Sequence, residues 1–322
     1  MRWRRTHKVL TGCFVSLGLF FILEGILEFL GIRVFSQSEI YVQKVTSWRL
    51  ESNLQKRRIQ TKHDQHDFLV STNNDGLRTS LSKESRNIDI AFLGDSNIFG
   101  WGVDDDETYD AQLQKNHPHL KILNAGQPGH SSFQSYELFT EYLPLYKPKW
   151  TILVLSMHDH NQTAISDVER SGSINGIIPH IRIFLHNHLR IYSLLRSFLF
   201  VETQNQANAT GETYRVRDDE REKLLKSMIE QAAVWNGKIA LALFPFYEDL
   251  MATHMNRPCL EWSQKMKQLY NVPVIDIHTC CLDPNSEWTF HFDHGHLNSK
   301  GINSVIPHLQ EELMKEGIID ID

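Results

Sequence analysis

The sequence predicts a layered α/β domain built on a parallel sheet, with a transmembrane helix in front of it. Short apolar runs alternate along the chain with longer segments of helical spacing, which is typical of a parallel sheet covered by helices. These runs lack strict polar alternation, as expected of strands buried on both faces. An uncharged stretch that follows a basic N-terminus predicts the membrane helix.

The N-terminal segment is basic and then apolar. Four basic side chains stand at its start: Arg2, Arg4, Arg5 and Lys8. Residues 9–23 carry no charge, and the apolar run resumes around Glu24 and Glu28 as far as Ile32. Roughly 24 residues are enough to cross a hydrocarbon core of about 30 Å as a helix.

Three interpretations of this segment compete: a signal anchor, a cleaved signal peptide, and a buried helix of the soluble fold. No small-x-small cleavage pattern follows the apolar stretch, which favours the anchor. Basic residues on the near side place the N-terminus in the cytoplasm. We therefore expect a single-pass protein of the cell membrane whose remaining chain is extracytoplasmic, either periplasmic or on the cell surface.

The chain divides into three parts by composition. Residues 1–34 hold the cytoplasmic basic head and the transmembrane anchor. Residues 35–86 are polar with mixed charge and weak periodicity, which predicts a stalk and lead-in rather than a domain. Residues 87–322 form the α/β domain, with an insertion at about 161–216.

Strands and helices alternate from residue 87 onward. Five expected strands are Ile88–Leu93, Lys121–Leu123, Thr151–Leu155, Lys238–Phe244 and Val272–Ile277. Four expected helices are Tyr136–Leu145, Asp219–Trp235, Leu260–Tyr270 and Ser299–Met314. In open α/β sheets the ligand site lies beyond the carboxyl ends of the strands, so the chemistry should follow directly after each apolar run.

The charge balance excludes one class of partner. The net charge is −6, and no dense Lys/Arg stripe occurs outside the N-terminus, so we expect no nucleic acid partner. The cysteine spacing does not suggest a zinc site, and we expect neither a metal nor a cofactor.

The first strand ends at Gly94-Asp95-Ser96. A serine at this strand-to-helix turn would point its hydroxyl into the crevice and keep a free N–H at the helix start. Alternatively, Ser96 simply caps the following helix. The second strand ends in a loop in which Gly126 and Gly129 flank a proline. Such a loop can present backbone N–H groups to an anion; alternatively, it is an ordinary turn.

Two further polar groups complete the set. His158, Asp159, His160 and Asn161 follow the third strand. Near the C-terminus, Asp293 and His296 are close enough in one loop for the carboxylate to orient the imidazole. A serine hydroxyl needs such an oriented base to lose its proton during attack.

Together these positions resemble the four sequence blocks of SGNH (GDSL-like) hydrolases of the membrane-anchored bacterial type. The matching stretches are Gly94-Asp95-Ser96 for the nucleophile block, Gly129 five residues after Asn124 for the glycine block, Met157-His158-Asp159 for the Gly-x-Asn-Asp block, Asp293-His294-Gly295-His296 for the Asp-x-x-His block, and Asn74-Asp75-Gly76-Leu77-Arg78 for the lead-in. The resemblance covers roughly residue 71 to the C-terminus. It implies a flavodoxin-like three-layer sandwich, and the absence of a Gly-x-Ser-x-Gly elbow speaks against the common α/β-hydrolase fold.

The resemblance also implies roles for single residues. Ser96, Asp293 and His296 would form a catalytic triad, and the N–H groups of Ser96 and Gly129 would bind the oxyanion. His158 stands where the family carries the oxyanion-binding Asn, and an imidazole can also donate a hydrogen bond. Supporting roles would fall to Asp95, Asp159 and Asn161.

The function implied is ester hydrolysis or acyl transfer through an acyl-enzyme on Ser96. The expected extracytoplasmic location favours an O-acylated envelope glycan as the substrate, and a small-molecule ester is the other substrate class expected. Because His158 departs from the family pattern, a degenerate domain that binds a glycan or a partner without turnover is the alternative. A metallohydrolase using His158, Asp159 and His160 with His291, Asp293 and His294 is a further alternative. The segment 181–201, apolar with several arginines, predicts a helix packed over the crevice or one lying on a membrane surface.

Overall fold

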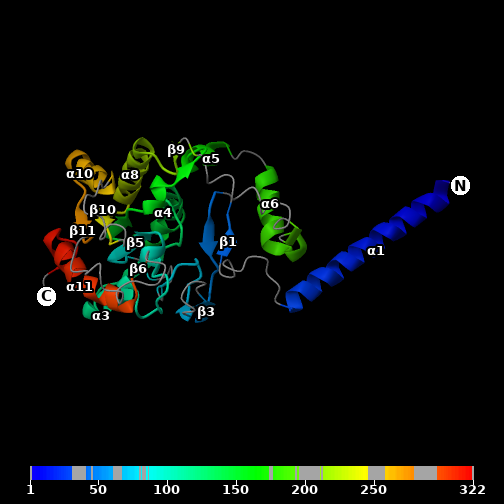
Figure 1. Cartoon of the computed structure of the whole chain (residues 1–322), viewed down its shortest axis with the longest axis horizontal. Helices are drawn as coiled ribbons and strands as arrows, with labels where there is room; N and C mark the ends of the chain where they lie inside the picture. Colours follow the sequence, from blue (N-terminus) through cyan, green and yellow to red (C-terminus); the bar gives the residue numbers. More distant parts are fainter. Residues whose placement is uncertain are drawn as a thin grey trace.

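The computed structural model (Figure 1) describes residues 2–30, 41–44, 46–60, 67–79, 81, 85, 87–173, 177–192, 194–195, 211, 213–245, 258–278 and 296–320. Its centre is a sheet of five strands: β5 (Ile90–Gly94), β6 (Ile122–Gly126), β7 (Trp150–Val154), β10 (Lys238–Leu243) and β11 (Val274–Asp276). Neighbouring strands pair in parallel in the order β11-β10-β7-β5-β6. Numbered along the chain this is the order 2-1-3-4-5, that of the flavodoxin-like fold, so the predicted fold class is confirmed.

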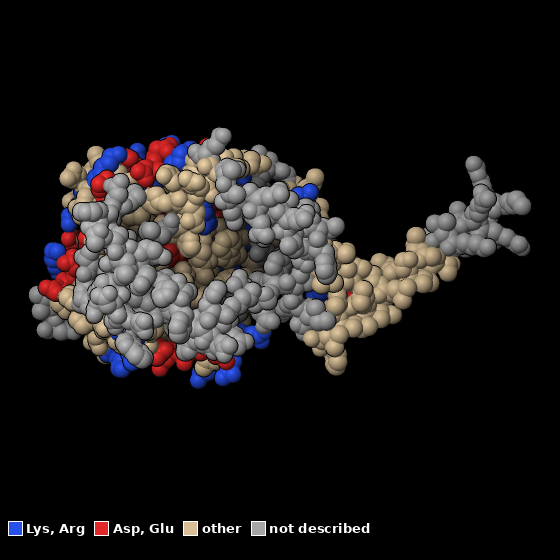
Figure 2. Space-filling view, viewed as in Figure 1, with Lys and Arg blue, Asp and Glu red and all other residues tan. Residues whose placement is uncertain are grey.

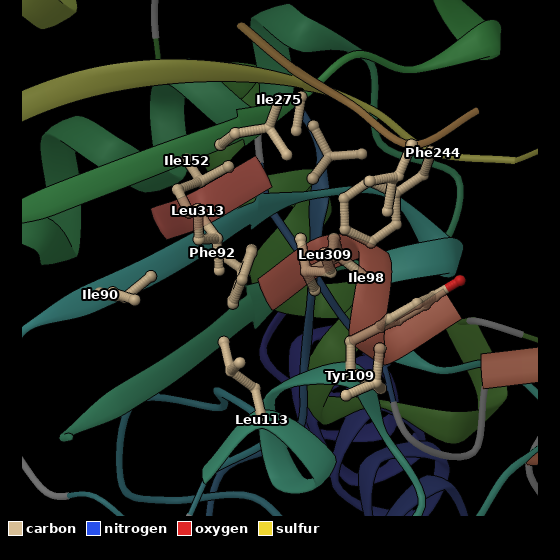
Figure 3. Close-up of a cluster of buried hydrophobic side chains, with 14 of the residues drawn as sticks. Ile90, Phe92, Ile98, Tyr109, Leu113, Ile152, Phe244, Ile275, Leu309 and Leu313 are labelled. Atoms are coloured by element: carbon tan, nitrogen blue, oxygen red, sulfur yellow. The ribbon is translucent and has the colours of Figure 1, made fainter. Parts of the chain in front are cut away.

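Helices cover both faces of this sheet. Along β5, Ile90 and Phe92 enter one core cluster, and Ala91 and Leu93 enter the other. The first cluster is closed by α3 (Tyr109–Asn116) and α11 (Ser299–Lys315), and Figure 3 shows its side chains interleaved between strands and helix. The second is closed by α4 (Ser132–Tyr146), α8 (Asp218–Ala233) and α10 (Pro258–Tyr270). Burial on both faces is why the strands are apolar without alternation, and each buried Leu, Ile or Phe side chain contributes about 1.5–3 kcal/mol.

The segment that we expected to be a stalk is folded against this domain where it is described. Its two antiparallel hairpins are β1 (Tyr41–Gln43) with β2 (Trp48–Leu50), and β3 (Arg57–Gln60) with β4 (Asp67–Val70). Leu50, Phe68 and Val70 are buried in a third cluster with Phe99. The strands are too short and too polar to show a periodic signal, because only one or two side chains of each enter the core.

The described part of the insertion at about 161–216 contains a two-stranded antiparallel sheet, two helices, and further helical residues at 190–192 and 194–195. β8 (Gln162–Thr163) pairs with β9 (Thr213–Tyr214), and between them lie α5 (Asp167–Ser173) and α6 (Ile177–His188). No described residue of α6 is buried, and Ile177, Ile178 and Phe184 are exposed. In the described part of this segment, α6 lies against β1 without burying any of its own residues.

The N-terminal helix α1 (Arg2–Phe29) extends away from the folded body (Figure 1). Its 19 residues from Thr11 to Phe29 are long and apolar enough to cross a membrane. The described surface of this helix is almost free of Lys, Arg, Asp and Glu, whereas such residues are spread over the body (Figure 2). Its two carboxylates lie at the end near the body: Glu24 accepts the N–H groups of Arg190 and Ile191, and Glu28 lies 3.8 Å from the Arg190 guanidinium.

Candidate active site

Ser96 is the first residue of the short helix α2 (Ser96–Phe99), which begins directly after β5. Asp95 is the N-cap, and its Oδ1 accepts the N–H of Asn97 at 3.0 Å. The Ser96 side chain therefore does not need to cap the helix, which removes the simpler explanation for a serine at this point. The helix ends after one turn at Gly100, whose φ of 78° is left-handed.

His296 contacts Ser96. Its Nε2 lies 2.7 Å from the Ser96 hydroxyl oxygen, although the two residues are 200 positions apart in the chain. The histidine stands just before α11, whose N-cap Asn298 accepts the N–H of Gly301 at 3.0 Å. With Nε2 unprotonated, the serine hydroxyl donates to it, which is the arrangement of a nucleophile and its base. Asp293, the third residue of the predicted triad, lies outside the described residues.

The glycine loop after β6 is fastened beside Ser96. The N–H of Gln127 donates to the carbonyl of Gly94 at 3.0 Å, which ties the start of this loop to the end of β5. Gly129 has a φ of 75°, a conformation that other residues rarely adopt. Within the described part of the chain, neither the Ser96 N–H nor the Gly129 N–H has a hydrogen-bond partner. Both donors can therefore serve an anion.

The β1–β2 hairpin and the turn at Gly76 hold the glycine loop from outside. Gln127 accepts the N–H of Leu50 at 3.0 Å and donates to the carbonyl of Gly76 at 3.2 Å. Trp48 donates its indole N–H to the carbonyl of Pro128 at 2.9 Å. In return, Nε2 of His130 lies 3.0 Å from the Trp48 carbonyl, so Nε2 carries the proton. Burial, with the positive charge of Arg49 second, lowers the pKa of His130 well below its ordinary value, which keeps this imidazole neutral.

Arg78, from the lead-in that the sequence singled out, fixes the turn after α2. Its guanidinium donates to four carbonyls: Leu69 at 2.9 Å, Phe99 at 2.9 Å, Gly100 at 2.7 Å and Val103 at 2.7 Å. Asp105 lies 3.0 Å from its Nε and balances the charge. Burial lowers the pKa of Arg78, and the charge of Asp105 opposes that shift.

His158 lies in a 3₁₀ turn, η1 (Met157–His160), directly beyond β7. Ser156 links this turn to the nucleophile: its Oγ donates to Asp95 Oδ2 at 2.7 Å and accepts the N–H of His158 at 3.1 Å. The Nδ2 of Asn161 lies 3.4 Å from His158 Nδ1. If Nδ1 accepts from this amide, the ring proton is on Nε2, which can then donate to a ligand.

Asp159 holds the turn in place, and both of its carboxylate oxygens accept hydrogen bonds from other residues. Its Oδ1 accepts the N–H of Ser132 at 2.7 Å, and its Oδ2 accepts the Ser132 hydroxyl at 2.5 Å and Arg221 Nε at 3.0 Å. The residue is fully buried. Among the described residues no group of three His, Cys, Asp or Glu side chains is arranged to hold a metal. The histidines and aspartate of the metallohydrolase hypothesis between 291 and 294 lie outside those residues.

A cavity of about 690 Å³ lies beside the glycine loop. Lys44, Trp48, Asn161, Asp167, Arg170 and Arg215 are among the residues that line it. It adjoins the site because Arg215 Nη1 donates to the carbonyl of Gly129 at 3.1 Å.

Three contributors were missed from the sequence: Trp48, Ser156 and Arg215. Each acts through a contact with a residue distant in the chain, and none stands in a motif. For Ser156 alone a signal was available, because a serine directly after a buried strand has the same position as the residues that we did select.

No family model and no curated protein matches the chain. Solved structures do resemble it at low identity. The psychrotrophic esterase EstA from Pseudoalteromonas is 14% identical, with 70% of this chain and 96% of that chain covered and a TM-score of 0.45. A lipolytic protein of the G-D-S-L family from Desulfitobacterium hafniense is 14% identical, with coverages of 70% and 98% and a TM-score of 0.43. A variant of the acetyl-xylooligosaccharide esterase Axe2 from Geobacillus is 16% identical, with coverages of 72% and 96% and a TM-score of 0.44. These likenesses are distant, and the strand order described above establishes the fold without them.

Proposed function

We propose that the chain is a serine esterase of the SGNH type with Ser96 as its nucleophile. The observation that carries the proposal is the 2.7 Å contact between the Ser96 hydroxyl and His296 Nε2 at the carboxyl end of the sheet. Acyl transfer requires a nucleophile paired with a base, next to backbone N–H groups that are free to bind an oxyanion. Ser96 and Gly129 offer two such N–H groups, which have no partner among the described residues.

In the proposed reaction His296 Nε2 takes the proton of Ser96 as its oxygen attacks the ester carbonyl. The tetrahedral intermediate collapses to an acyl-enzyme, and the leaving alcohol receives the proton from His296. A water molecule, activated by the same imidazole, then attacks the acyl-enzyme and releases the acid and the serine hydroxyl. An acceptor alcohol in place of water would give acyl transfer.

The developing oxyanion would be held by the N–H groups of Ser96 and Gly129 and by Nε2 of His158. Support for the third donor is the Asn161 amide at 3.4 Å from His158 Nδ1, which favours the Nε2–H tautomer. Asp293 would orient His296 through its other ring nitrogen. The supporting role of Asp95 rests on its bond to Ser156, which joins the nucleophile turn to the His158 turn.

We place the enzyme on the membrane, with α1 as a single span and the folded body outside the cytoplasm. The position of Glu24 and Glu28 at the body end of α1 supports this, because each carboxylate is costly in the middle of a bilayer. The exposed apolar residues of α6, which lies beside that end, suit a membrane surface. This location favours an O-acylated envelope glycan as substrate. Alkaline carbonate should leave the full chain in the membrane pellet, and protease should digest the body only from the extracytoplasmic side.

The direct test is labelling of the full-length protein by a fluorophosphonate probe. We expect Ser96 to be labelled, Ser96→Ala to abolish labelling, and His296→Ala to abolish it almost as completely. Ser131→Ala, which alters a buried serine at the cap of α4, is the control and should still be labelled. Folded protein that is neither labelled nor active on a broad ester panel would favour a binding domain without turnover.

A further inference from the structure

The cavity beside the glycine loop is large enough for a ligand of its own. Its volume of about 690 Å³ lies within the range of roughly 300–1,000 Å³ common for small-molecule sites. Its wall is polar and includes hydroxyls, amides and three cationic side chains together with the ring of Trp48. None of these residues belongs to the proposed triad.

Two of the three proposed oxyanion donors touch the cavity wall. Gly129 contacts both Trp48, whose Cζ2 lies 3.1 Å from the position of a Cβ on this glycine, and Arg215, 3.1 Å from its carbonyl oxygen. His158 contacts the wall through Asn161, at 3.4 Å. These contacts place the cavity next to the two loops that carry the proposed oxyanion donors.

The cavity carries an excess of positive charge. Asp167, the one carboxylate among the described residues that line the cavity, is bonded to Arg215 Nε at 3.0 Å and to the Ser131 hydroxyl at 2.8 Å. Arg215 is fully used, because its other nitrogens bond Gly129 and, at 2.8 Å, Gln134 Oε1. Arg215 and Asp167 are thus parts of the wall that neutralise each other.

The remaining cations are available to a ligand. Arg170 is half-exposed, and its nearest carboxylate oxygen, on Asp167, lies 3.6 Å away. Lys44 is also partly exposed, 3.5 Å from Glu141, a carboxylate that lies 3.7 Å from Arg49 as well. An anionic group on a ligand would meet Arg170 and Lys44 without first displacing a strong internal bond.

The lining also suits a sugar. Ser47, Thr46, Gln162 and Thr163 place hydroxyl and amide groups around the cavity, and the Trp48 ring offers an apolar face. Sugar hydroxyls both donate and accept, as these groups do. We propose that the cavity binds an anionic sugar of an O-acylated glycan, with Arg170 and Lys44 recognising its carboxylate or phosphate. This inference rests on the proposed esterase function for its role in turnover, and its binding part can be tested without turnover.

The binding experiment uses the full chain in detergent and oligogalacturonides without acyl groups, followed by isothermal titration calorimetry. We expect saturable binding that weakens about tenfold in Arg170→Gln, because one charge-assisted hydrogen bond contributes about that factor. Arg58→Gln, which removes an exposed arginine paired with Asp67 outside the cavity, should bind like the parent protein. The same oligosaccharides with their carboxylates reduced to alcohols should bind at least tenfold more weakly than the acidic form. Inorganic phosphate as competitor would distinguish recognition of a bare anion from recognition of the sugar.

The turnover experiment compares acetylated oligogalacturonides with equally acetylated, carboxyl-reduced ones. Arg170→Gln should raise KM about tenfold for the acidic substrate alone, with kcat and the hydrolysis of p-nitrophenyl acetate unchanged. Equal binding of the acidic and reduced oligosaccharides by the parent, or no effect of Arg170→Gln on the acidic one, overturns the inference. If the parent protein does not hydrolyse p-nitrophenyl acetate, that result counts against the esterase function, whereas the binding experiment still tests the sugar site.

Discussion

The indole of Trp48 lies against Gly129, with Cζ2 3.1 Å from the position where a Cβ on that glycine would stand. A hairpin from before the α/β domain thus shapes the loop that would bind the oxyanion. The bond from the Trp48 N–H to the Pro128 carbonyl, at 2.9 Å, fixes the loop one residue before Gly129. The hairpin is therefore part of the candidate site and not only a connection to the N-terminal helix.

Replacing Trp48 by Phe should lower the turnover rate, an effect that its loss of stability does not explain. The phenyl ring loses the bond to Pro128, so the Gly129 N–H is held less firmly, and we expect kcat to fall about tenfold with little change in KM. The chain offers a matched control, because Trp235 donates to the carbonyl of Pro148 at 3.0 Å far from the site. Trp235→Phe should lose a similar stability, about 1 kcal/mol, with kcat unchanged.

Kinetics on p-nitrophenyl acetate and thermal unfolding of both variants decide the matter. Equal kcat values in the two variants would show that Trp48 is structural only.

His158 should act in the transition state rather than in substrate binding. His158→Ala should lower kcat about 100- to 1,000-fold at nearly constant KM, and His158→Asn should keep most of the activity because an amide can donate from the same place. Asn161→Ala removes the amide that keeps the His158 proton on Nε2, so it should reduce kcat in the parent. In the His158→Asn background the same change should leave kcat unaffected. A His158→Ala enzyme as fast as the parent would exclude the donor role.

The sequence predicted the sheet closely and the site in part. The five strands lie within a few residues of the expected runs, because side chains such as Phe92 and Leu93 are buried on opposite faces and leave no polar position between them. The contact of Ser96 with His296 was foreseen because each residue stands in a recognisable motif. The polar group nearest to the His158 ring nitrogen is the Asn161 amide, whereas the adjacent Asp159 is bonded to Ser132 and Arg221.

What the sequence could not predict are tertiary contacts without a local signal. Trp48 and Pro128 are 80 positions apart, and a single tryptophan in a polar segment predicts neither a partner nor a direction. The cavity is lined by residues from the β1–β2 hairpin, α4, β8 with the preceding Asn161, α5 and Arg215, so no single stretch of the sequence contains it. The buried residues of the hairpins, among them Leu50 and Phe68, are too few in each strand to form a pattern.

Arg78 should be a main contributor to the stability of the nucleophile turn. Arg78→Ala leaves four carbonyls and Asp105 without their donor, and we expect the free energy of unfolding to fall by about 3–5 kcal/mol. Arg58→Ala, an exposed arginine paired with Asp67, should cost less than about 0.5 kcal/mol. Chemical denaturation of the two variants measures this difference, and a loss below 1 kcal/mol for Arg78→Ala would contradict the assignment.

His130 should make the stability of the protein depend on pH in a defined direction. Its pKa is lowered in the folded state, first by burial and then by the charge of Arg49, so the unfolded chain binds the proton more tightly. The stabilisation is therefore fully present above the ordinary histidine pKa of about 6.5, and it decreases as the pH falls below that value toward the folded-state pKa. Within this window the loss approaches about 1.4 kcal/mol for each pH unit.

The measurement is the melting temperature of the parent and of His130→Gln between pH 8 and pH 5. Glutamine has an amide N–H that can reach the Trp48 carbonyl in place of Nε2, but it does not titrate. The variant should therefore lose less stability than the parent as the pH falls, while His308→Gln, which changes a partly exposed histidine on α11, should keep the parent's slope. Parallel curves for the parent and His130→Gln would mean that the buried imidazole binds a proton at no cost in stability. That result would contradict the assignment of His130 as a neutral imidazole in the folded state.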